Sequence, residues 1–172
     1  MRLTALIAAA ALTGVAAPAL AQTAAPAAAS TGVTVADTRT WLTGLGGQVS
    51  EPTMVGNAQI VRIADQPLPW SLTFYACATL CDDVQYSATF TGPITEAQVT
   101  AWNRDNRYVT AAWYAPETEG GEASVLARYD VLLTANGAEQ LREPTVVWLQ
   151  QLRAFAQYLA GPAAPAAPPA GQ

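Results

Sequence analysis

The chain has 172 residues, and its 13 acidic side chains outnumber its 8 basic ones, which gives a formal net charge of −5 at pH 7. All eight basic residues are arginines, and neither lysine nor histidine occurs. This composition excludes Schiff-base chemistry, P-loop phosphate binding, histidine general-base catalysis and histidine-ligated metal sites. The negative charge also argues against binding to DNA, RNA or an anionic membrane surface.

The N-terminal segment has the pattern of a secretory signal peptide. Arg2 precedes an apolar stretch from Leu3 to Val15, and Ala19-Leu20-Ala21 precedes Gln22 as a small-x-small cleavage motif. We therefore predict that residues 1–21 are removed by cleavage between Ala21 and Gln22. An uncleaved anchor is the alternative, but the apolar stretch is shorter than the roughly 20 residues that span a bilayer. Export predicts a periplasmic or secreted bacterial protein without a stable membrane anchor.

Two segments of low complexity flank the predicted folded body. Residues 22–32 are rich in Ala, Pro, Ser and Thr, and residues 161–172 are almost entirely Pro, Ala and Gly. Such segments cannot bury enough apolar surface to become ordered. We predict a disordered linker over 22–32, a disordered tail over 161–172, and one domain over 33–160, which is long enough to form a single core.

The first half of this domain predicts one helix followed by four strands. Thr34 is a helix N-cap with Asp37 three residues later, and the helix is expected to stop at Gly46-Gly47. Alternation of apolar and polar residues makes the third and fourth strands a half-buried β-hairpin. The predicted strands are Val49 to Met54, weakened by Pro52, then Ile60 to Ile63, Trp70 to Tyr75 and Val84 to Phe90.

The second half predicts a helix, two strands and a last helix. Thr95 and Gln98 form a capping box at the start of the second helix. Strands follow over Arg107 to Tyr114 and Ser124 to Leu133, and Pro144 lies in the first turn of the last helix. The order α-β-β-β-β-α-β-β-α favours an α+β domain with a mainly antiparallel sheet packed by three helices.

Two cysteines, Cys77 and Cys81, lie at the tip of the predicted hairpin. Export into an oxidising compartment and the closeness of the paired strands predict that they form a structural disulfide. The alternative is a redox switch or a thiol-disulfide exchanger. The spacing is C-x₃-C rather than C-x-x-C, and no neighbouring basic side chain would activate a thiolate, so we favour the structural role.

The sequence predicts no catalytic, metal or cofactor site. No G-x-S-x-G motif occurs, and a serine nucleophile would have no histidine or lysine as its base. Asp82 and Asp83 are adjacent, so on a strand they point to opposite faces, which disfavours a calcium site. A carboxylate pair of the glycosidase kind stays open, because its separation depends on tertiary structure. We expect a protein that is not an enzyme.

The segment Trp102 to Tyr108, with the sequence W-N-R-D-N-R-Y, stands out at the end of the second helix. Trp102 lies on the core face of that helix, and either Asn103 or Asn106 is expected to close the helix in the left-handed conformation. These features are structural rather than functional.

Arg104, Arg107 and Tyr108 are the candidate partner-binding residues within this segment. Arginine next to an aromatic ring can hold a carboxylate or the end of a peptide chain. The competing interpretation, which is the more common use of such arginines, is an ion pair with Asp105 or with another acidic residue.

These motifs resemble the YbjN domain family, also described as bacterial sensory transduction regulators, whose fold is similar to type III secretion chaperones. The resemblance rests on the first helix ending in Leu45-Gly46-Gly47, the cysteine pair before Val84-Gln85-Tyr86, the W-N-R-x-N-R-Y segment and a last helix with Phe155. It covers about residues 33–160. It implies a type III secretion chaperone-like fold and a non-catalytic protein or peptide binder, with no established active site.

We therefore expect an exported, non-catalytic module that binds a protein or peptide in the bacterial cell envelope, in a chaperone-like or regulatory role. The main alternative is a carrier of a small molecule or lipid. Its pocket would lie between helices and sheet and be lined by Trp41, Trp70, Trp113 or Trp148. A thiol-disulfide exchange protein is a more remote alternative. The sequence indicates neither the partner nor the oligomeric state.

Overall fold

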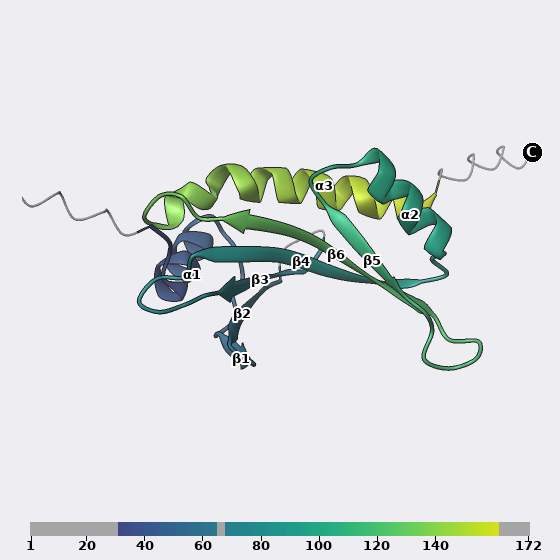
Figure 1. Ribbon diagram of the computed structural model, residues 1–172, viewed down its shortest axis with the longest axis horizontal. Coiled ribbons are helices and arrows are strands. Elements are labelled where there is room, and N and C mark those ends of the chain that lie inside the picture. Colours follow the sequence, from purple (N-terminus) through teal and green to yellow (C-terminus); the bar gives the residue numbers. More distant parts are fainter. Residues whose placement is uncertain (1–30, 65–67, 162–172) are drawn as a thin grey trace, which may run out of the picture.

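The computed structural model describes residues 31–64 and 68–161, which form one six-stranded sheet and three α-helices (Figure 1). The predicted signal peptide with its cleavage site at Ala21 and Gln22, most of the predicted linker and the predicted tail after Gly161 lie outside the described residues. Among the described residues, no helix is both long and apolar enough to cross a membrane.

The sheet is antiparallel throughout, and its strand order is β1-β2-β3-β4-β6-β5. The predicted order of helices and strands is confirmed, and a short 3-10 helix, η1, precedes the last helix as an addition that the sequence did not indicate. The elements are α1 (Val35–Gly44), β1 (Thr53–Val55), β2 (Ala58–Ile63), β3 (Trp70–Tyr75), β4 (Asp83–Gly92), α2 (Glu96–Asp105), β5 (Thr110–Tyr114), β6 (Ala123–Leu132), η1 (Ala138–Leu141) and α3 (Arg142–Ala160).

The predicted helix ends are formed as their residues indicate. The Thr34 hydroxyl accepts a hydrogen bond from the Asp37 backbone N–H at 3.0 Å. Thr95 and Gln98 form the reciprocal capping box at the start of α2. After α1, Gly46 adopts a φ of +95°, which a glycine tolerates at little cost.

Two strands begin later than predicted. The first strand was expected over Val49 to Met54, but β1 begins only at Thr53. Pro52 immediately precedes it and has no N–H to donate to a neighbouring strand. The strand expected from Arg107 begins at Thr110, because the residues before it connect the end of α2 to the sheet.

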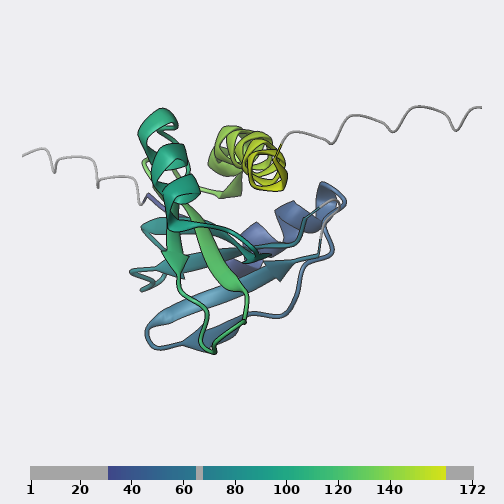
Figure 2. The same ribbon diagram turned by 90° about the vertical axis from the view of Figure 1, so that its right-hand side faces the viewer.

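The core lies between α3 and one face of the sheet. α3 runs along this face, with α1 near one of its ends and α2 near the other (Figure 1), and α2 and α3 lie on the same side of the sheet (Figure 2). Trp148 and Phe155 of α3 have no exposed surface. The Trp148 ring centroid lies 5.9 Å from that of Tyr86 and 6.5 Å from that of Trp70, and the Phe155 centroid lies 5.3 Å from that of Phe90. These rings fill the space between helix and sheet.

The segment before α1 is held between the disulfide loop and the connection from β6 to η1. Val33 exchanges two backbone hydrogen bonds with Cys81, at 3.1 and 2.8 Å. Gly32 donates to the Ala135 carbonyl at 2.8 Å and accepts from the Gly137 N–H at 3.0 Å. Gly32 has a φ of +118°, and a Cβ built there would lie 2.5 Å from the Cys81 carbonyl oxygen. Only glycine fits this position without a shift of the backbone.

Candidate binding surfaces

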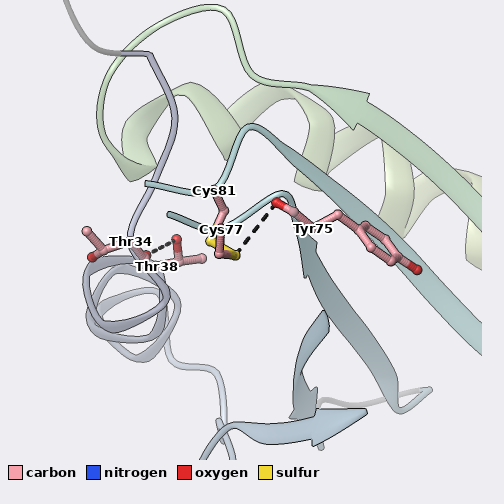
Figure 3. Close-up of a disulfide and its surroundings, with 5 residues drawn as sticks. All are labelled: Thr34, Thr38, Tyr75, Cys77 and Cys81. Carbon is pink, nitrogen blue, oxygen red and sulfur yellow. Dashed lines mark hydrogen bonds between the residues drawn. A yellow bond between two sulfur atoms is a disulfide. The ribbon is translucent and has the colours of Figure 1, made fainter. Parts of the chain in front are cut away.

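The predicted disulfide between Cys77 and Cys81 is confirmed, and it closes the connection from β3 to β4 (Figure 3). Cys81 is only 3% exposed, and its backbone is paired with Val33 as described above. The Cys77 sulfur lies 3.6 Å from the carbonyl oxygen of Tyr75. Burial and backbone pairing hinder attack at Cys81, whereas Cys77 is only half-buried. The structural interpretation therefore still depends on the C-x₃-C spacing and on the lack of a neighbouring basic side chain in the sequence.

Two acidic residues, Asp82 and Asp83, follow the disulfide directly, and the pKa of Asp83 is shifted. Partial burial raises the pKa of Asp83 above its ordinary value, and the nearby charges of Asp130 and Asp82 raise it further. Within residues 31–64 and 68–161, no group of three or more His, Cys, Asp or Glu side chains is placed to hold a metal ion.

The structure places Trp102 in the core as predicted, but it corrects the way in which α2 ends. Trp102 is 4% exposed, and its indole N–H donates to the Val109 carbonyl at 3.0 Å. The predicted left-handed closure is wrong, because Asn106 is extended with a φ of −125° and Asn103 is still helical. Asn106 closes the helix through its side-chain amide and its backbone N–H, which donate to the Trp102 carbonyl at 3.0 and 2.9 Å.

Asn103 has a role that the sequence did not reveal. Its side-chain amide donates to the Ala111 carbonyl at 2.9 Å, and its amide oxygen accepts from the Ala111 N–H at 2.8 Å. β5 is the last strand of the sheet, so Asn103 satisfies backbone groups that an edge strand otherwise leaves open. An asparagine in the last turn of a helix that precedes an edge strand was the available signal, but it requires knowledge of the strand order.

Arg104 lies at the surface and is paired with its neighbour. Its Nε donates to Asp105 Oδ1 at 2.9 Å, and the two side chains are 73% and 62% exposed. The hydrogen bond from Arg104 lowers the pKa of Asp105 below its ordinary value. This is the ion pair of the competing interpretation.

Arg107 and Tyr108 form a different arrangement, which we call the Arg107–Tyr108 patch. The Arg107 guanidinium carbon lies 5.1 Å from the centroid of the Tyr108 ring, a cation–π contact. Tyr108 is 47% exposed, and its ring meets that of Tyr129 edge to face at 6.5 Å. Among the described residues, Arg107 takes part in none of the ion pairs, which are Arg39–Glu51, Arg104–Asp105 and Arg142–Glu139.

The four tryptophans expected to line a carrier pocket are not brought together around one. Trp70 and Trp148 are 3% and 0% exposed and contribute to the core. The indole N–H of Trp41 donates to Glu139 at 3.0 Å, and that of Trp113 donates to the Ile94 carbonyl at 2.9 Å. This geometry disfavours the carrier alternative, because side chains already occupy the space between α3 and the sheet.

Comparison with known proteins gives one structural similarity. No protein-family model and no curated protein matches the chain. Among solved structures, the fold is similar to that of YbjN from E. coli, described as a proposed transcription regulator. The TM-score is 0.44 with 16% sequence identity, over 66% of this chain and 78% of the YbjN chain. At this level, the similarity concerns the arrangement of helices and strands, and it assigns no function.

Proposed function

We propose that this chain is an exported, non-catalytic module that binds an acidic peptide segment of a partner protein at the Arg107–Tyr108 patch. The observation that carries the proposal is the Arg107 guanidinium over the exposed Tyr108 ring, with no ion pair to an acid in the described part of the chain. Export is supported by the signal-like pattern of residues 1–21 and by the disulfide, which is typical of oxidising compartments.

The chemistry of the patch suits a carboxylate. An arginine that is stacked on an aromatic ring is held in place by the ring face, while its N–H groups stay directed outward in a planar fork. Such a fork binds a carboxylate through two parallel hydrogen bonds. Tyr108 adds apolar contact area next to that charge, and arginine and tyrosine are the residue types that contribute most to binding energy at interfaces.

Arg104 has a supporting role in this proposal. Its exposed pair with Asp105 is weak in water, so a carboxylate of the partner can compete with Asp105 for the guanidinium. We therefore keep Arg104 with Arg107 and Tyr108 as the proposed contact residues. A chain without histidine or lysine lacks the usual acid, base and nucleophile combinations, which favours binding over catalysis.

A selection from random peptides tests the proposal, because it does not require an identified partner. Random peptides displayed on phage are selected on the purified protein, and the dissociation constants of the enriched peptides are measured by calorimetry. We expect enrichment of Asp and Glu, and we expect Arg107→Gln to weaken binding by about tenfold, the loss typical of one charged hydrogen-bonded contact. Arg153→Gln, at another exposed arginine outside the ion pairs, is the matched control and should leave binding unchanged.

Peptides without acidic residues, or acidic peptides that bind Arg107→Gln and the unchanged protein equally well, would show that the patch is not the binding site.

A further inference from the structure

A second polar surface lies on the face of the sheet that points away from α3. Trp70 and Tyr86 contact α3, so the residues that follow them, Ser71 and Ser87, face the opposite side. The register pairs Arg62 of β2 with Ser71, Ser71 with Ser87, and Ser87 with Arg128 of β6. One row across four strands therefore reads Arg62, Ser71, Ser87, Arg128.

The spacing of this row suits a ligand of small-molecule size. Neighbouring strands lie about 4.8 Å apart, so the backbones of Arg62 and Arg128 are separated by roughly 14 Å, with two short serine side chains between them. In this row, a long arginine side chain thus flanks the two short hydroxyl side chains on each side. Both guanidinium groups can reach toward the centre of the row.

A hollow of about 350 Å³ opens beside this row, where β3 begins. Arg62 and the hydroxyl-bearing residues Ser71, Ser87 and Thr89 line it. Trp70 is also among the lining residues, but its indole ring lies against Trp148 of α3, on the other side of the sheet, so the ring supplies no donor to the hollow. The hollow is within the size range of small-molecule sites. Its lining combines one cation with three hydroxyl groups that can donate a hydrogen bond.

The charges around the row leave the arginines available. Neither Arg62 nor Arg128 belongs to an ion pair within the described part of the chain. The nearest acid along β6 on the same face is Asp130, two residues after Arg128, and its Oδ1 accepts a hydrogen bond from Gln85 at 2.6 Å. Asp83 lies two residues before Gln85 on β4, so it belongs to the next row on the same face. Asp130 is therefore in the row next to Arg128, whereas Arg62 of β2 is three strands away from Asp130.

We infer that this hollow binds an oxyanion group of a small molecule, either a carboxylate or a phosphate. Arg62 lines the hollow and would supply its charge, and Arg128, which does not line it, would reach toward it from beyond Ser87. The hydroxyls of Ser71, Ser87 and Thr89 would donate to the anion oxygens. Carboxylate and phosphate share this chemistry. The site is independent of the Arg107–Tyr108 patch, because it uses different residues on other strands.

The experiment follows the Arg62 Nε–H and the backbone N–H groups of Ser71 and Ser87 by NMR in the full chain. Inorganic phosphate and succinate are titrated separately at constant ionic strength, with sodium chloride as the reference. We expect saturable shifts of these signals with at least one of the two anions, and the stronger one identifies the oxyanion class.

Arg62→Gln and Arg128→Gln are the informative variants. Each is expected to weaken binding by about tenfold, as the loss of a charged contact does, whereas Arg153→Gln should leave the titration unchanged. Arg62 is exposed and Arg128 is half-buried, and retained backbone spectra show that the variants are folded. The inference is overturned if neither anion produces saturable shifts, or if both Gln variants bind as the unchanged protein does.

Discussion

The side-chain amide of Asn103 is joined to the backbone of Ala111 by two hydrogen bonds, at 2.9 and 2.8 Å, and this pairing covers part of the outer edge of β5. The Asn103 side chain thus satisfies the two backbone groups of Ala111 that would otherwise be open to pairing with another strand. It also fixes α2 to the sheet directly before the Arg107–Tyr108 patch. The positions of Arg107 and Tyr108 therefore depend on Asn103, which is not among the proposed contact residues.

Replacing Asn103 with Ala is expected to lower the free energy of unfolding by about 1 to 3 kcal/mol, because two backbone groups of Ala111 lose their partners. It also opens the edge of β5 for pairing between molecules. Urea denaturation measures the first effect and light scattering measures the second. Thr100→Ala, at an exposed position of the same helix, is the control. Equal stability of the two variants would show that the Asn103 pairing is unimportant.

Gly32→Ala is expected to destabilise the domain by about 1 to 3 kcal/mol, because an L residue is strained at this φ and its Cβ would meet the Cys81 carbonyl. Gly44→Ala provides a matched comparison, since Gly44 is helical and a Cβ there meets nothing within 4 Å. That variant should gain about 0.5 to 1 kcal/mol from helix propensity. Thermal unfolding of both variants checks that the two substitutions change stability in opposite directions. A Gly32→Ala protein as stable as the unchanged protein would show that the close approach of residue 32 to the Cys81 carbonyl does not require glycine.

Replacing Cys77 and Cys81 together with Ser is expected to cost roughly 1 to 2 kcal/mol without abolishing the fold, because the bond closes a very short loop. The measurement is equilibrium denaturation of the variant beside the oxidised protein. Mass spectrometry after alkylation without reductant should find no modified thiol in the latter. A variant that fails to fold, or free thiols in the native protein, would contradict the prediction that this disulfide adds a modest amount of stability to a fold that forms without it.

Asp83→Asn is expected to stabilise the domain slightly at neutral pH. A carboxyl whose pKa is raised on folding binds its proton more tightly in the folded state. Stability is therefore lost as the pH rises from the unfolded pKa, near 3.8, through the higher folded pKa. Removing the charge should gain less than about 1 kcal/mol at pH 7, since solvent screens the site.

The same variant should flatten the pH dependence of stability above the unfolded pKa of 3.8, where a raised carboxyl pKa makes stability fall with rising pH. High salt should reduce the difference, because it screens the contributions of Asp130 and Asp82. Glu119→Gln is the control, because it removes one negative charge from an exposed loop between β5 and β6, away from the site of Asp83. A gain of equal size in that control would mean that net charge, not the site of Asp83, is responsible.

Features that depend on local patterns could be predicted from the sequence. The strand from Trp70 to Tyr75 and the caps at Thr34 and Thr95 each involve residues close in the chain, and all were confirmed. The alternation within that strand is incomplete, because Thr73 of the predicted polar face is buried. The disulfide was predictable for the same reason, because Cys77 and Cys81 lie within one hairpin connection.

Features that depend on strand order could not be predicted. β6 lies between β4 and β5, so Arg128 meets Ser87 across a long stretch of sequence. The same order makes β5 an edge strand and gives Asn103 its partner. The surface of Arg62 and Arg128 was missed because nothing near either residue in the chain indicates the other.

The most direct test of peptide binding at the Arg107–Tyr108 patch is a charge-exchange experiment with the best peptide from the selection. The dissociation constant is measured for Arg107→Glu and for the unchanged protein, each with the acidic peptide and with a peptide in which Lys replaces the contacting acid. The free energy of unfolding is measured in parallel. We predict that Arg107→Glu loses the acidic peptide, regains affinity for the lysine peptide and keeps its stability. Unchanged affinity for the acidic peptide, or loss of both peptides together with stability, would contradict the proposed function.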